Sequence, residues 1–236
     1  MKDARELLSS RTGAKTVNFE SSGGGGKPAL TSQDVAAALA YVPAGLGREL
    51  LEALWWPESG ARRRDALRQA VIGLVAPEFT RQMHHLATVR TEFGIAKACM
   101  GWGGNQVTDT QRRELLRTEQ ALDEARAAAW PNNTMEQLGV LAGAVIAEMT
   151  SCGCCKTCQG TRVQAAPAGS GVVECEACGG MGLEQLSGRK RGAAIGADDA
   201  AYRRFWRPVY EWMLQRMRSA EHVAAEQFSR ALNRAA

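Results

Sequence analysis

The stretch "SCGCCKTCQGTRVQAAPAGSGVVECEACGGMG", from Ser151 to Gly182, holds six of the chain's seven cysteines. Within it, Cys155 and Cys158 form one Cys-x-x-Cys pair, and Cys175 and Cys178 form a second. Glycines follow both pairs and allow the tight turn that points backbone N–H groups at the sulfurs. With "TRVQ" and "VVE" as strands and "APAGSG" as the turn, the pattern predicts a β-hairpin that carries two zinc knuckles.

The doubled pair predicts one structural Zn²⁺, because four thiolates in a tetrahedron are the usual arrangement for structural zinc. The expected ligands are Cys155, Cys158, Cys175 and Cys178. A closed four-cysteine site has no open position for a catalytic water. Two alternatives fit less well. A redox Cys-x-x-Cys normally occurs once, at a helix N-terminus in an α/β pattern, and an iron–sulfur cluster would use four of the six cysteines at other spacings.

The remaining cysteines are interpreted as spare thiols. Cys152 stands at ligand spacing from Cys155, so a shifted first pair is the alternative for Cys152, and Cys154 has no assigned role. Cys99 has apolar neighbours in a helical pattern and is predicted to be a buried, inert thiol.

Outside this stretch the chain reads as mainly α. Apolar residues recur at helical spacing, and Thr108 with Gln111 forms a capping box. Pro77 is expected to end one helix before the next begins at Phe79. The expected helices are "DVAAALA", "LGRELLEALWW", Arg62–Ala76, Phe79–Met100, 109–129 and the segment after Thr134.

The fold class is therefore a helical body with an inserted four-cysteine zinc-knuckle β-hairpin and a C-terminal segment resembling a helix-turn-helix. Four consecutive glycines near residue 25 predict a flexible arm at the N-terminus. The expected domains are a flexible arm (1–30), a helical body (31–150), a zinc-binding module (151–186), and a basic helix-turn-helix-like segment with a C-terminal helix that packs on the body (187–236).

Composition excludes several classes of protein. The 236 residues are 23% charged and 45% hydrophobic, as in an ordinary globular protein. The N-terminus has no signal-peptide pattern, and no apolar run is long enough to span a bilayer, so we expect an intracellular protein without a membrane partner. No catalytic constellation or phosphate-binding loop stands out, and we expect that the protein is not an enzyme.

Positive charge gathers directly after the cysteines. Residues 187–218 hold eight Arg and Lys against three acids, a net of +5 that exceeds the whole chain's +4. The segment "RKRGAAIGADDAAYRRFWRPVY" predicts a short helix to Ile195, a turn at Gly196, and a second helix capped by Asp198 or Asp199.

On that second helix Tyr202, Phe205 and Val209 share a stripe, which is expected to face the core. The cations around it then form a candidate DNA-binding surface. A solvated helix face is the alternative. The candidate DNA-binding residues are Arg189, Lys190, Arg191, Arg203, Arg204 and Arg207.

Several motifs in order resemble the antitermination protein Q family of lambdoid bacteriophages, in its lambda-type branch. They run from Thr31 to the C-terminus and comprise "TSQDVAAALA", "AGLG", "CKTCQGT", "CEACGGMG", "RPVYEWM" and the acid- and alanine-rich C-terminal helix. The chain departs from the family in a longer helical segment between Gly101 and Asn133 and in Arg162, where a second glycine is usual. The family aligns poorly over 187–199, so the candidate DNA contacts come from the charge pattern alone.

The resemblance implies a transcription antitermination factor that works in the cytoplasm of the host bacterium. Such proteins bind double-stranded DNA at a phage late promoter and load onto paused RNA polymerase holoenzyme. They contact the β flap and σ region 4. They then modify the RNA exit channel, which brings nascent RNA in as a further expected partner, and so suppress pausing and termination.

Two other functions stay open. The first is a zinc-containing DNA-binding transcriptional regulator without antitermination, which uses the same parts. The second is a zinc-centre chaperone cofactor, since Cys-x-x-Cys-x-Gly repeats resemble those of J-domain co-chaperones. That centre normally has four knuckles and a His-Pro-Asp motif, whereas this chain has two knuckles and no such motif.

Overall fold

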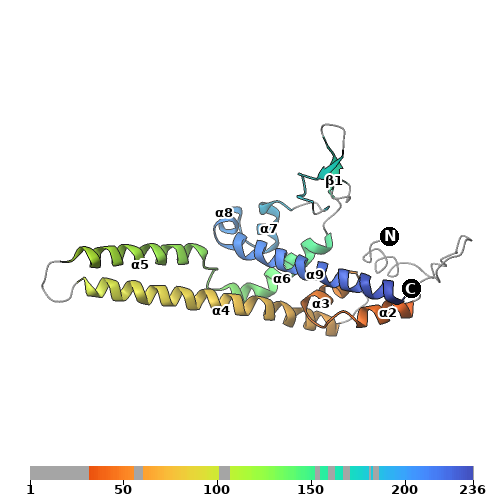
Figure 1. Cartoon of the computed structure of the whole chain (residues 1–236), viewed down its shortest axis with the longest axis horizontal. Coiled ribbons are helices and arrows are strands. Elements are labelled where there is room, and N and C mark those ends of the chain that lie inside the picture. The colour runs from red at the N-terminus through yellow and green to blue at the C-terminus, as the bar shows by residue number, and fades with distance from the viewer. Residues whose placement is uncertain are drawn as a thin grey trace, which may run out of the picture. The chain divides into compact units, whose positions relative to one another are not determined.

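The structure is a computed structural model that describes residues 32–55, 61–100, 107–151, 155–158, 163–166, 171–180, 182 and 186–235. The predicted N-terminal arm, Cys152 and Cys154, and residues 167–170 of the hairpin turn lie outside these ranges. The described residues are mainly helical with one small antiparallel hairpin (Figure 1), as the sequence predicts. They fall into two compact units, one of residues up to Val71 together with those from Gly139 onward, and one of Ile72–Leu138.

The first unit is built around its C-terminal helix. This helix, α9, has an apolar face that is buried from Val209 to Leu232 and packs against α2 and α3. The helical elements of this unit are α2 (Ser32–Ala40), α3 (Leu46–Trp55), the start of α4 (Ala61–Cys99), α6 (Thr134–Ser151, from Gly139 on), α7 (Gly188–Ala194), α8 (Asp199–Ala201), the π-helical turn η1 (Tyr202–Trp206) and α9 (Arg207–Ala235).

Gly47 is the point of closest approach between α3 and α9. A Cβ atom at this position would press into the carbonyl oxygen of Ala220 and lie 3.1 Å from the Cβ of Ala224. The absence of a side chain at Gly47 therefore lets the two helix backbones meet, and this contact helps to close the core of the first unit.

We expect Gly47→Ala to lower the free energy of unfolding by about 1–3 kcal/mol, since backbone atoms of α9 cannot move aside as a flexible side chain would. Gly143→Ala in α6 is the matched control, because a Cβ there meets nothing within 4 Å. The control should raise stability by up to about 1 kcal/mol through helix propensity. Urea unfolding followed by circular dichroism measures both, and equal effects of the two variants would contradict the packing argument.

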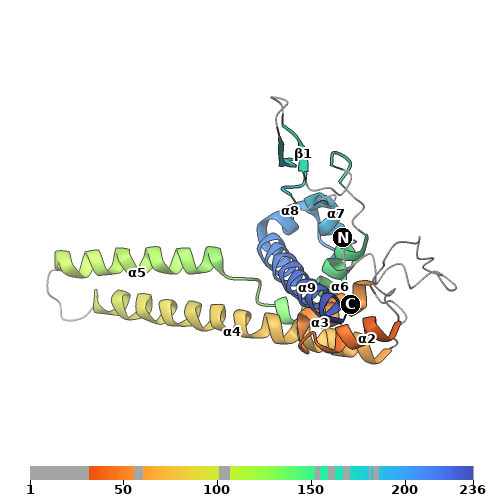
Figure 2. The ribbon, with the colours of Figure 1, turned by 45° about the vertical axis from the view of Figure 1, so that its right-hand side comes forward.

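The second unit is a helical hairpin. The part of α4 from Ile72 onward runs antiparallel to α5 (Asp109–Ala128), and the two lie side by side in both views (Figures 1 and 2). Their contact is a narrow apolar seam, which consists of Leu86, Val89, Phe93, Ala121, Leu122 and Ala125. The predicted capping box is confirmed, because the Gln111 N–H donates to Thr108 Oγ1 (3.2 Å) and the Thr108 N–H donates to Gln111 Oε1 (2.9 Å).

The predicted helix break at Pro77 is wrong. The helix α4 runs without interruption through Pro77. Proline removes one backbone hydrogen bond, the one that the carbonyl of Gly73 would accept. Both Gly73 and Pro77 lie on the exposed side of the helix, so water can reach this carbonyl. Hydration of this carbonyl reduces the free-energy cost of the missing hydrogen bond, and the residues on both sides of Pro77 form one helix.

The prediction for Cys99 is also wrong, because the Cys99 thiol is exposed. The apolar stripe of this part of α4 passes through Leu86, Val89 and Phe93. Helical spacing carries that stripe on to Ala96 and Met100, which are both half-buried, and leaves Cys99 to one side of it.

Across the described ranges, no helix combines the length and the apolar character that crossing a bilayer would require.

Candidate functional site

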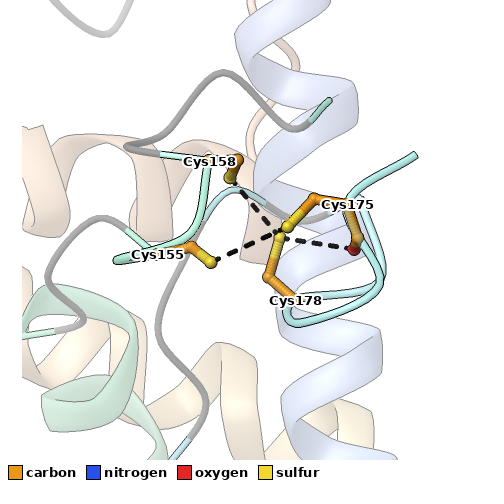
Figure 3. A group of neighbouring side chains, drawn as sticks. All are labelled: Cys155, Cys158, Cys175 and Cys178. Carbon is orange, nitrogen blue, oxygen red and sulfur yellow. Dashed lines mark hydrogen bonds between the residues drawn. The ribbon is translucent and has the colours of Figure 1, made fainter. Parts of the chain in front are cut away.

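Four cysteines from two loops converge on one point. Cys155 and Cys158 come from the loop after α6, and Cys175 and Cys178 from the loop after the hairpin (Figure 3). The sulfurs of Cys155 and Cys175 are 3.9 Å apart, those of Cys158 and Cys178 are 3.7 Å apart, and all four lie within 4.8 Å of one another. All four side chains are buried. The predicted ligand set is thus assembled in a form that could hold a metal ion.

A short β-hairpin brings the two loops together. Strands β1 (Val163–Ala165) and β2 (Val172–Glu174) pair antiparallel, with Gln164 opposite Val173. At the base of the module the Cys155 N–H donates to the carbonyl of Gly182 at 2.8 Å, which joins the start of the first knuckle to the end of the second. The hairpin supplies few buried apolar contacts of its own, since Val163, Val172 and Val173 are all exposed.

Glycines with positive φ shape the second knuckle. Gly179, Gly180 and Gly182 have φ of 56°, 67° and 74°, which side chains disfavour. This turn lets the Gly182 N–H donate to Cys178 Sγ at 3.2 Å and the Gly180 N–H donate to the carbonyl of Cys175 at 3.2 Å. An N–H that points at a sulfur stabilises the thiolate form, which is the form that binds metals.

Two thiols of the cluster have shifted pKa values, in opposite directions. The backbone N–H of Cys158, directed at the Cys155 sulfur, lowers the pKa of Cys155 to about 6. Burial raises the pKa of Cys175 to about 11. A cation at the centre would compensate the buried negative charge that four thiolates carry, so metal binding releases protons and weakens as the pH falls.

The cluster is not a pair of disulfides. A disulfide joins its sulfurs at about 2.05 Å, whereas the pairs across the cluster are 3.7 and 3.9 Å apart and all four cysteines are free thiols. An all-sulfur donor set also disfavours magnesium and calcium, which bind oxygen ligands.

In the segment after the module, the turn at Gly196 and the cap at Asp198 lie where the sequence predicts them. The short helix α7 is followed by Gly196, whose φ of 70° makes the turn, and Asp198 caps α8 by accepting from the Ala201 N–H at 2.7 Å. In Figures 1 and 2, α7 and α8 lie side by side at the N-terminal end of α9. The further interpretation of this segment as a helix-turn-helix that reads DNA stays a prediction.

Five of the six candidate DNA-binding residues are exposed: Arg189, Lys190, Arg203, Arg204 and Arg207. Two of these arginines make exposed ion pairs with an acid four residues away. Arg203 pairs with Asp199 at 2.7 Å, and Arg207 pairs with Glu211 at 3.0 Å. Such pairs are weak, typically 0.3–0.5 kcal/mol as an approximate range. A phosphate group could therefore displace either carboxylate.

The sixth candidate, Arg191, is buried and has to be removed from the DNA-binding set. Its guanidinium makes a bidentate pair with Glu148 of α6, in which Nε donates to Oε2 at 2.8 Å and Nη2 donates to Oε1 at 2.7 Å. It also lies 5.5 Å from the centre of the Tyr210 ring. Arg191 therefore holds α7 against α6 and α9 rather than facing solvent.

Glu148 is the centre of a buried polar network. Its carboxylate accepts a hydrogen bond from the Tyr210 hydroxyl at 3.0 Å and lies 3.5 Å from the Arg218 guanidinium. Its side chain is fully buried. The Glu148 carboxylate raises the pKa of Arg191, and burial raises the pKa of Tyr210. The network fixes one charged group each from α6, α7 and α9.

The prediction for Phe205 is wrong, because 49% of this residue is exposed while Tyr202 and Val209 are buried as expected. The cause is η1, in which the Arg207 N–H donates to the carbonyl of Tyr202, five residues back instead of four. This wider turn shifts the buried stripe from Phe205 to Trp206, which is half-buried. The Phe205 ring then points away from the core with the Arg204 guanidinium 5.1 Å from its centre.

The sequence interpretation missed Glu148, although a signal exists. Glu148 stands three residues after Val145 and seven after Leu141, so it falls on the apolar face of α6. An acid in that position predicts a buried basic partner. The exposed Phe205 had no comparable signal, since a π-helical turn has no clear sequence pattern.

Comparison of the chain with family models, with curated proteins and with solved structures gave no match.

Proposed function

We propose that the protein is a transcription antitermination factor with one structural Zn²⁺. In this proposal it binds promoter-proximal double-stranded DNA and loads onto paused bacterial RNA polymerase, at the β flap and σ region 4. It then suppresses pausing and termination at the RNA exit channel, in the cytoplasm of a phage-infected bacterium. We assign no catalytic role to any residue.

The spacing of the sulfurs supports zinc. Four sulfurs at a Zn–S distance of about 2.3 Å in a regular tetrahedron are about 3.8 Å apart. Two sulfur–sulfur distances across the cluster, 3.7 and 3.9 Å, lie on either side of this value. A cluster of several iron atoms would hold its ligand sulfurs farther apart, because the irons and bridging sulfides occupy the centre. Burial of all four cysteines fits a structural ion rather than a catalytic one.

One observation supports DNA binding: two elements of the first unit that pack together, α7 and η1, both carry exposed cations. A Cβ at Gly192 would lie 3.1 Å from the Cβ of Tyr202, so α7 rests directly on η1. Arg189 and Lys190 thus lie on an element that packs against the one carrying Arg203 and Arg204, with Arg207 following at the start of α9, and we call these five residues the basic corner. Such a surface can neutralise several phosphates at once.

The antitermination part of the proposal rests on the ordered motifs shared with the lambda-type Q family. Because the basic corner alone would also suit a plain DNA-binding regulator, terminator read-through decides between the two functions. Host holoenzyme is used to transcribe a template with a lambdoid late promoter and a downstream intrinsic terminator, with and without the protein. Read-through that depends on promoter-proximal DNA supports antitermination. A promoter footprint without read-through supports the regulator instead.

We expect Arg203→Ala with Arg204→Ala to weaken binding to a DNA duplex at low salt. The slope of log K against log salt should become shallower by about 2, since two phosphate contacts are lost. Fluorescence anisotropy across a salt series measures this slope. Arg112→Ala with Arg113→Ala on α5 is the matched control, another adjacent pair of exposed arginines. An unchanged slope in the first variant, or an equal change in both, would place DNA elsewhere on the protein.

A further inference from the structure

The exposed ring of Phe205 stands inside the basic corner. It is bracketed in sequence by Arg203, Arg204 and Arg207, and all three are exposed. With 49% of the residue exposed, Phe205 presents an apolar surface among cations. A lone exposed aromatic residue needs no special explanation, but one with a guanidinium over its ring and two more exposed arginines beside it in sequence limits the kind of ligand it could meet.

The backbone holds this ring outward. An uninterrupted α-helix would place Phe205 on the stripe with Tyr202 and Val209, which are both buried. The π-helical turn removes Phe205 from that stripe, and Asp198 and the Tyr202 ring fix the turn on its N-terminal side. Turns of this kind are rare and frequently lie at functional sites. The exposure of Phe205 therefore follows from the backbone and not from a freely rotating side chain.

The chemistry of the corner matches a nucleic acid. The Arg204 guanidinium lies 5.1 Å from the centre of the Phe205 ring, so charge and π surface are presented together. A nucleobase stacks on an aromatic ring while its phosphates pair with neighbouring arginines. In a continuous duplex both faces of each base are already covered by neighbouring bases, so stacking on Phe205 needs a base that has left the stack.

We propose that Phe205 stacks on an unpaired or extruded base, so that the basic corner binds DNA with a melted stretch in preference to a continuous duplex. This inference rests on the proposed DNA binding and narrows its substrate class. The arginines supply affinity for the backbone of either form. Phe205 supplies the discrimination, because only the melted form offers it a free base face.

The test uses the full chain and three fluorescent probes of equal length that share one labelled strand: a fully paired duplex, a duplex whose second strand is mismatched at the centre to form a bubble, and the single strand. The protein should bind the bubble probe about 5- to 150-fold more tightly than the duplex, the range that one stacked base provides. Phe205→Ala should remove this preference and leave both duplex affinity and salt slope unchanged. Phe205→Trp should retain it. A 2-aminopurine in the bubble should be quenched by the wild type and by Phe205→Trp but not by Phe205→Ala.

Val223→Ala is the matched control, since Val223 on α9 is also 49% exposed and lies outside the basic corner. It should keep the preference for the bubble. A bubble preference that survives in Phe205→Ala, or that is lost equally in Val223→Ala, overturns the stacking role. If Arg203→Ala with Arg204→Ala then still weakens binding to every probe, the proposed DNA binding stands without it. Failure of the wild type to bind any probe overturns both proposals.

Discussion

Replacement of Cys155 and Cys175 by serine is expected to abolish metal binding and to unfold the module from Cys155 to Gly182. The hairpin is only three residue pairs long and its valines are exposed, so apolar burial alone cannot hold it. Structural zinc contributes about 10–16 kcal/mol in small zinc-dependent folds, and here it would supply nearly all of the module's stability. The core around α9 has its own buried apolar contacts and should remain folded.

Metal content by mass spectrometry and amide hydrogen exchange together measure this result. The wild type should carry one zinc per chain, and the double variant none. Exchange should become fast in the module while amides in the middle of α9 stay protected. Cys99→Ser is the control, because Cys99 is exposed and far along the chain from the cluster. A metal-free double variant whose module amides remain protected would show that the module does not depend on a metal.

Glu148→Gln is expected to cost about 3–5 kcal/mol of unfolding free energy, the usual effect of leaving a buried charge without its partner. The change keeps the shape of the side chain but removes the charge that faces Arg191 and Arg218. By contrast, Glu226→Gln breaks an exposed pair with Arg230 on α9 and should cost less than about 1 kcal/mol.

Urea unfolding of both variants, read by circular dichroism, gives the comparison. Arg191→Met completes a double-mutant cycle with Glu148→Gln. The sum of the two single losses in unfolding free energy should exceed the loss in the double variant. In the double variant both charges of the pair are removed, so neither is left buried without the other. Additive losses across the cycle would show that the 2.7 and 2.8 Å bonds between Arg191 and Glu148 contribute no coupling to stability.

The features that sequence predicted well are those that neighbouring residues determine. The two Cys-x-x-Cys pairs assemble as expected, because ligand spacing fixes the local geometry. The Thr108 capping box and the Gly196 turn follow from single side chains and a single φ. For the same reason, a mainly helical chain with an inserted hairpin could be predicted from periodicity and turn residues alone.

The features that sequence reasoning missed depend on distant partners or on small changes of register. In the sequence, Arg191 does not differ from its neighbours Arg189 and Lys190. Its partner Glu148 lies 43 residues away, and the pair is buried in the folded chain. Phe205 is turned outward by one additional residue in a helical turn. Pro77 stays within a helix because the carbonyl that loses its hydrogen bond lies on the exposed side, where water can reach it. No local sequence pattern reveals which side that is.

The pair of Glu148 with Arg191 joins the chain just before the cysteine module to the chain just after it. The cysteine module is therefore a long insertion whose two ends are held together at the helical core by this pair. Lengthening such a closed loop is inexpensive, about 0.6 kcal/mol for each doubling. The core should thus tolerate additional residues between the two cysteine pairs with little loss of stability. The length of the cysteine module can change in this way while the helices that carry the basic corner keep their packing.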